Sequence, residues 1–118
     1  MNYKFINSEY LDSVTGDDPQ MINEIVILFK DQVREIHNEM KVLLEKKDFL
    51  KLGMLAHKAK SSVAIMGMNE LATILKTLEL SAKDGKNPEL YESYITKFGE
   101  DTRSAISELE DLVNKHKK

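Results

Sequence analysis

The 118-residue sequence contains no cysteine and no tryptophan, and it has only two prolines. Without cysteine, disulfides, zinc–thiolate sites and thiol catalysis are excluded. The sequence also lacks an excess of positive charge, because its formal net charge is −3, and this argues against binding to nucleic acid. No apolar run approaches the roughly 18 residues of a membrane span, and the N-terminus carries no apolar stretch of signal-peptide length. These absences predict a soluble, cytoplasmic protein that binds neither nucleic acid nor membranes.

The composition that remains is typical of one globular domain. Apolar residues make up 42% and charged residues 31% of the chain, which are ordinary proportions for a protein that folds around a core. A chain of this length can bury a single core but not two. We therefore expect residues 1–118 to form one domain.

Apolar residues recur in alternating steps of three and four along four stretches of the chain. This spacing places them on one face of a helix, as in helical bundles. No stretch alternates with period two for long enough to suggest a strand. The four stripes are Ile22, Val26, Phe29, Val33, Ile36, Met40 and Leu43; Phe49, Leu52, Ala56, Ala59, Val63 and Met66; Leu71, Leu75, Leu78 and Ala82; and Tyr91, Ile95, Phe98, Thr102, Ala105, Leu109 and Leu112.

Helix boundary signals separate these stripes. Both prolines directly follow a capping residue, and proline is favoured at the first position of a helix. The boundary residues are Asp18 with Pro19, Asp48, Asn69, and Asn87 with Pro88 at helix starts, and Gly67 and Gly85 at helix ends. The pattern predicts helices over 19–46, 49–66, 70–84 and 88–115, preceded by a short helix near 8–15. Because the connections are short, the predicted fold is an all-α, antiparallel up-and-down four-helix bundle with a short N-terminal helix.

One histidine, His57, lies well outside the apolar stripe of its helix. At about 100° per residue it is roughly 130° from the centre of that stripe, so its imidazole is expected to face solvent. Gly53, Ser61 and Ala64 are predicted to share this face and to leave room for a partner to approach the ring. We accordingly expect Gly53→Ala to stabilise the helix, because glycine is a poor helix former. Lys60 lies within reach, and an ammonium can stabilise a phosphoryl group added to a nucleophilic imidazole.

The stretch "AHKAKSSVAIMGMNEL" resembles the signature of histidine-containing phosphotransfer (HPt) domains of two-component signalling. That signature has a histidine, lysine at +3, usually glycine at +4, serine at +5 and glycine at +10. These places hold His57, Lys60, Ser61, Ser62 and Gly67. The departure at Ser61 keeps the position small, so we treat it as a mild variation. The resemblance extends over nearly the whole chain, because the family has the same helical layout.

The resemblance also implies functional residues on the following helix. The family carries a Gln or Glu 22 residues after the histidine and a basic residue at +26, and these places hold Glu79 and Lys83. By the resemblance, His57 is the phosphoacceptor, and Glu79 accepts a hydrogen bond from its Nδ1–H. Lys60 and Lys83 would stabilise charge on the phosphoryl oxygens. Antiparallel packing of the two helices would bring these side chains together.

The resemblance implies a relay protein that passes a phosphoryl group between the aspartates of receiver domains. Its partners would be response-regulator receiver domains or a hybrid sensor histidine kinase, and the receiver would supply the Mg²⁺ ion. We expect a monomer without cofactor or metal of its own, because the four stripes are satisfied within one bundle and no ligand cluster appears. Nothing in the sequence resembles a nucleotide site, so we expect a phosphocarrier without autokinase activity.

Other interpretations of the sequence stay open. The chain could be a helical adaptor, or a phosphotransfer-like pseudo-domain whose surface histidine is incidental. It could also be the phosphoacceptor domain of a chemotaxis-type kinase, which has the same bundle and a similar histidine motif. A second histidine, His37, is adjacent to the apolar stripe of its helix and is predicted to be a partly buried structural residue.

Overall fold

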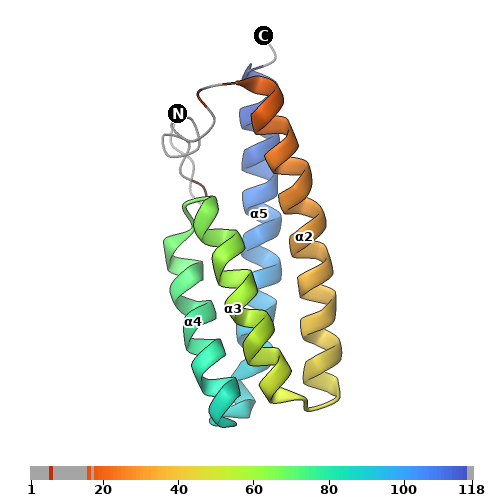
Figure 1. The fold of residues 1–118 in the computed structure, drawn as a ribbon, viewed down its shortest axis with the longest axis vertical. Coiled ribbons are helices and arrows are strands. Elements are labelled where there is room, and N and C mark those ends of the chain that lie inside the picture. The colour runs from red at the N-terminus through yellow and green to blue at the C-terminus, as the bar shows by residue number, and fades with distance from the viewer. Residues whose placement is uncertain (1–5, 7–15, 17, 117–118) are drawn as a thin grey trace.

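The computed structural model describes residues 6, 16 and 18–116, and within them the chain forms an all-α bundle. Its elements are α2 (Pro19–Glu45), α3 (Phe49–Ile65), α4 (Asn69–Asp84), the short 3-10 helix η1 (Pro88–Leu90) and α5 (Tyr91–His116). Successive long helices run in opposite directions, as Figure 1 shows. The predicted antiparallel four-helix bundle is therefore confirmed. The short helix predicted near residues 8–15 lies outside the described residues.

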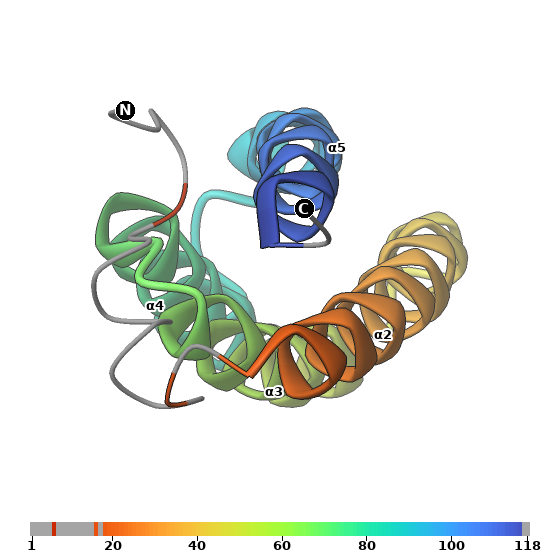
Figure 2. The ribbon, with the colours of Figure 1, turned by 90° about the horizontal axis from the view of Figure 1, so that it is seen from above.

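The four long helices follow one another around the bundle axis (Figure 2). α3 packs between α2 and α4, and α5 contacts both α2 and α4 to close the bundle. The molecule is elongated, with extents of 48 × 20 × 19 Å. None of the helices in the described part of the chain is long and apolar enough to cross a lipid bilayer.

The apolar stripes meet in the centre of the bundle. Leu52, Leu75 and Phe98 are among the fully buried side chains, whereas Phe49 is only partly buried. Thr102 is the one polar residue in the stripes, and it too is buried. Its hydroxyl donates to the Phe98 carbonyl at 2.7 Å, so the polar group is satisfied within its own helix and a threonine fits at a core position.

Aspartate side chains cap two of the helices, as predicted. Oδ1 of Asp18 accepts a hydrogen bond from the Gln20 N–H at 3.0 Å, at the start of α2. Oδ1 of Asp48 accepts from the Lys51 N–H at 3.3 Å, at the start of α3. Each bond satisfies one of the amide groups that the first turn of a helix leaves without a partner. Gly85 ends α4 with a φ of 67°, a left-handed conformation that glycine adopts without strain.

Neither of the two predicted asparagine caps makes a side-chain capping bond. Asn69 lies inside α4, whose N-cap is Met68 and makes no side-chain capping bond. Met68 is buried, and its N–H donates to the Val63 carbonyl at 3.1 Å, so the end of α3 leads directly into α4. Asn87 is the N-cap residue of η1, directly before Pro88 as predicted, but its φ of 54° is left-handed, whereas a capping residue typically has an extended backbone, and its side chain makes no capping bond. Because the turn that follows Asn87 is a 3-10 helix, α5 begins at Tyr91 and not at the predicted residue 88.

Candidate functional site

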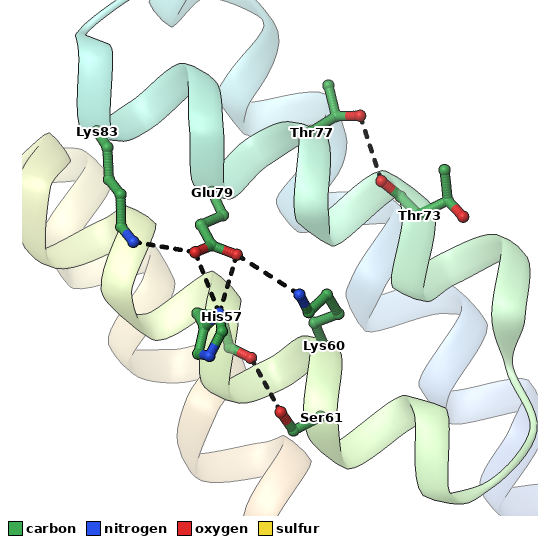
Figure 3. A network of polar contacts seen from close by, with 7 residues as sticks. All are labelled: His57, Lys60, Ser61, Thr73, Thr77, Glu79 and Lys83. Atoms are coloured by element: carbon green, nitrogen blue, oxygen red, sulfur yellow. Dashed lines mark hydrogen bonds and ion pairs between the residues drawn. The ribbon is translucent and has the colours of Figure 1, made fainter.

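His57 lies near the middle of α3 and turns its imidazole toward α4 at the molecular surface (Figure 3). Its side chain is 59% exposed, in agreement with the sequence analysis. Nδ1 lies 3.1 Å from both carboxylate oxygens of Glu79 on α4. The other ring nitrogen points away from that carboxylate. The structure thus brings together two residues that the sequence predicted to meet across an antiparallel helix pair.

The carboxylate of Glu79 determines which ring nitrogen of His57 is available for chemistry. An ionised carboxylate only accepts hydrogen bonds, so in the neutral imidazole the proton must be on Nδ1, which faces it. Nε2 then has a free lone pair on the side away from Glu79. The arrangement presents a nucleophilic nitrogen to a molecule that approaches from solvent.

Two lysines approach the same carboxylate from opposite sides (Figure 3). Lys83 Nζ lies 2.9 Å from Oε2 of Glu79, and Lys60 Nζ lies 3.9 Å from Oε1. The sequence analysis expected both ammonium groups to serve a phosphoryl group on His57. In this structure both face Glu79, and Lys83 is held at the shorter distance.

Glu79 is an anion despite its burial. Only 7% of the residue is exposed, and burial by itself raises the pKa of its carboxyl group. Hydrogen bonds from Lys83 and His57, together with the charge of Lys83, more than offset the burial, and the pKa of Glu79 is lowered from its usual value of 4.5. The carboxylate is therefore ionised at neutral pH, as the assignment of the His57 tautomer requires.

Gly53 does not lie on the exposed face with His57, contrary to the prediction. It is buried where α3 meets α4. A Cβ atom at this position would lie 2.8 Å from Lys83 Cγ and 2.9 Å from the backbone oxygen of Glu79, closer than real Cβ atoms come. The expectation that alanine stabilises this position is therefore wrong. The buried arc of α3 is wider than its apolar stripe, because α3 packs against two neighbours, and Gly53 lies at the edge of that arc.

The small residues on the other side of His57 are exposed, as predicted for Ser61 and Ala64. Ser61 Oγ lies 3.5 Å from the His57 carbonyl oxygen, so its hydroxyl faces its own helix. Ser62, by contrast, is buried, and its hydroxyl donates to Oε1 of Gln32 on α2 at 2.8 Å. The serine at +5 therefore connects α3 to α2, and the sequence analysis did not identify Gln32 as its partner.

Exposed apolar side chains occur on both helices of the site, and the sequence analysis did not single them out. Leu50, Met54 and Ile65 lie on the exposed face of α3, and Leu80 follows Glu79 on α4. Each exposes more than half of its surface, and we refer to these four residues as the apolar rim. A helical projection centred on His57 instead of on the core stripe would have found the three residues of α3. Apolar residues gathered on an exposed face are typical of a surface that a protein partner covers.

His37, on α2, lies away from this site, and its side chain is half-buried next to α5. Its Nε2 is buried, has no hydrogen-bond partner among the residues that the structure describes, and faces Gly99, where a Cβ atom would lie 2.5 Å from it. Burial and the nearby charge of Lys41 lower the pKa of His37, and Arg103 adds to this, while a hydrogen bond to the Ile95 backbone opposes it. These surroundings agree with the partly buried structural residue that the sequence predicted.

A comparison with protein families finds a match to the Hpt domain over residues 24–115. The chain belongs to the Hpt domain family. Hpt domains carry out histidine phosphotransfer in two-component phosphorelays, where they interact with receiver domains and kinases. The match covers both helices of the candidate site and confirms the family resemblance seen in the sequence. No curated protein and no solved structure matches the chain.

Proposed function

We propose that this Hpt domain relays a phosphoryl group between receiver-domain aspartates through Nε2 of His57. The observation that carries the proposal is the 3.1 Å contact between Nδ1 and Glu79, which leaves Nε2 as the free, outward nitrogen. His37 does not offer such a nitrogen, because its Nε2 is buried against Gly99.

The chemistry follows from the tautomer of His57. The lone pair of Nε2 attacks the phosphorus of an aspartyl phosphate, the new N–P bond forms, and the P–O bond to the receiver's aspartate breaks. The aspartate leaves as a carboxylate, and no proton has to leave Nε2 because the ring proton is on Nδ1. Glu79 stabilises the positive charge that develops on the imidazole. Transfer to a second receiver reverses these steps.

Lys60 is the residue proposed to reach the phosphoryl oxygens. Its Nζ lies 3.9 Å from Oε1 of Glu79, one helical turn along from His57, so it can turn toward Nε2 without breaking a short hydrogen bond. Lys83 lies 2.9 Å from the same carboxylate, and we assign it to Glu79 instead. The resemblance implied that both lysines stabilise charge on the phosphoryl oxygens, and we now assign that role to Lys60 alone. The chain itself is assigned no cofactor, since the receiver would hold the Mg²⁺ ion.

The receiver domain is proposed to dock on the exposed face of α3. Ser61 and Ala64 are small and exposed beside His57, which leaves space for the receiver's aspartate. The apolar rim offers surface that a docked protein would remove from water. The monomeric state and the cytoplasmic location stay predictions from the sequence.

The proposal is tested by phosphotransfer from a purified receiver domain that carries a radiolabelled phosphoryl group on its aspartate. The full chain is expected to take up label that is stable to base and labile to acid, as a phosphohistidine is. His57→Gln should take up none, because the amide cannot attack phosphorus, while His37→Leu should be labelled like the parent. Undiminished labelling of His57→Gln would refute the assignment. A parent chain that takes up no label from any receiver domain of its own genome would favour the adaptor interpretation.

A further inference from the structure

The bare Cα of Gly53 forms a notch in α3 into which the neighbouring helix fits. A Cβ atom there would meet three atoms of α4: Lys83 Cγ at 2.8 Å, the Glu79 carbonyl oxygen at 2.9 Å and the Lys83 backbone nitrogen at 3.2 Å. Two of these belong to the backbone and cannot turn aside. Glycine is a poor helix former, so its place inside α3 agrees with a close helix contact that a Cβ atom would force to shift.

Lys83 connects this notch to the reactive histidine. Its stem passes over Gly53, and its Nζ lies 2.9 Å from Oε2 of Glu79. Both oxygens of that carboxylate lie 3.1 Å from Nδ1 of His57. Gly53, Lys83, Glu79 and His57 therefore form one continuous series of contacts, with the glycine at one end and the nucleophile at the other.

We propose that Gly53 is a positioning residue for His57. Its missing side chain sets the spacing of α3 and α4 at which Lys83 holds Glu79 against Nδ1. When a side chain at position 53 moves the helices apart, the carboxylate withdraws and the ring proton can move to Nε2, where it blocks attack on phosphorus. The expected effect on phosphotransfer rests on the proposed function, but the tautomer of His57 can be measured without any phosphoryl donor.

The test measures the tautomer of His57 by isotope-edited NMR of its ring nitrogens in the full chain. The parent is expected to show Nδ1–H as the dominant neutral form. Gly53→Ala should raise the Nε2–H fraction at least about twofold and slow phosphotransfer from a phosphorylated receiver at least about tenfold. A folded Gly53→Ala chain with the parent's tautomer ratio would overturn the proposal.

Gly99→Ala is the matched control, because it adds the same methyl group at another tight helical glycine. A Cβ atom at position 99 would lie 2.5 Å from Nε2 of His37, at the contact of α2 with α5. This variant is expected to lower the melting temperature and to leave the tautomer of His57 and the transfer rate at the parent's values. A change in that tautomer as large as in Gly53→Ala would show that loosening anywhere in the bundle suffices, and would overturn the positioning role.

A second variant keeps the test decisive if Gly53→Ala does not fold. Lys83→Ala removes Cγ, the atom closest to the added methyl group, together with the ammonium on Glu79. Lys83→Ala should shift the tautomer of His57 in the same direction as Gly53→Ala. The variant that combines the two substitutions should shift the tautomer no further than the larger of the single shifts, because both substitutions act through Glu79. Additive shifts, or a Lys83→Ala chain with the parent's ratio, would contradict the inference. A parent chain with the expected tautomer but no phosphotransfer would instead contradict the proposed function alone.

Discussion

Glu79 is expected to stabilise the fold in a pH-dependent way. Burial raises the pKa of its carboxyl group, but the hydrogen bonds from Lys83 and His57 outweigh burial, and the pKa in the folded chain lies below 4.5. The folded state therefore binds fewer protons than the unfolded state, and the stabilisation is complete above pH 4.5 and is lost as the pH falls through the folded value. Glu79→Gln should lower the free energy of unfolding by about 1.5–3 kcal/mol at neutral pH, with a smaller difference in acid.

Urea unfolding of both chains at neutral and acidic pH measures this difference. Glu35→Gln is the matched control, because Glu35 is exposed on α2 and the same exchange there should change stability by less than about 0.5 kcal/mol. An equal loss of stability for Glu79→Gln at both pH values would show that packing of the side chain, and not its charge, stabilises the bundle.

The residues of the site differ in how far the sequence could predict them. The meeting of His57 and Glu79 was predictable, because the family resemblance identified Glu79 and antiparallel packing of two helices joined by a short connection brings the two positions together. The burial of Gly53 was not, since glycine has no side chain to contribute to an apolar pattern. A helical projection also shows only one helix, and the atoms that exclude a Cβ at Gly53 belong to another.

The contact between α2 and α5 is expected to weaken in mild acid. Burial and the charge of Lys41 hold the pKa of His37 below 6.5 in the folded chain, so folding disfavours its protonation. The contribution of His37 to stability is complete above pH 6.5 and is lost as the pH falls through the folded value, by at most about 1.4 kcal/mol for each pH unit. His37→Leu, of similar volume, should remove this part of the pH dependence. Thermal unfolding of both chains between about pH 7.5 and 5.5 provides the measurement, and parallel curves would contradict the prediction.

The helices themselves were predictable from the sequence to within a few residues. Their stripes follow the helical period, and the side chains of Asp18 and Asp48 can satisfy the first amide groups whatever lies around them. The predictions for Asn69 and Asn87 differ from the structure because the backbone around each asparagine depends on residues outside the local sequence. The buried Met68 occupies the cap position of α4, and Asn87 precedes η1 with a left-handed backbone and without a side-chain capping bond. Sequence signals therefore predict the start of a helix where a side chain and a nearby amide group can form the capping bond by themselves.

In the bundle, the exposed His57 and the half-buried His37 lie at different helix pairs. His57 lies where α3 meets α4, with its outer nitrogen toward solvent and an anion behind it. His37 lies where α2 meets α5, half-buried and beside cations. The same side chain thus acts as a candidate nucleophile at one contact and as a packing element at the other. The position of each histidine relative to the apolar stripe of its helix already indicated this difference in the sequence, and the packing of the four helices agrees with it.

The face of the bundle around His57 is expected to bind receiver domains through the apolar rim. Met54 lies about one turn before His57 and is 59% exposed, so Met54→Gln should change the free energy of unfolding by less than about 0.5 kcal/mol. A docked receiver would have to remove water from the new amide, and this should slow transfer at low receiver concentration about tenfold, or about 1.4 kcal/mol. The rate at saturating receiver should stay near the parent's, because His57 and Glu79 are unchanged.

Ile27→Gln is the control for this surface, since Ile27 is 50% exposed on α2 beside α5 and belongs to another face. It should transfer at the parent's rate at every receiver concentration. Equal slowing by both variants would mean that the loss of any exposed apolar side chain weakens binding. The exposed face of α3 would then not be identified as the docking surface. A Met54→Gln chain that matches the parent at low receiver concentration would place the docking surface elsewhere. If Met54→Gln alone is slow, and only below saturation, the receiver reaches His57 across the exposed face of α3, where Nε2 points away from Glu79.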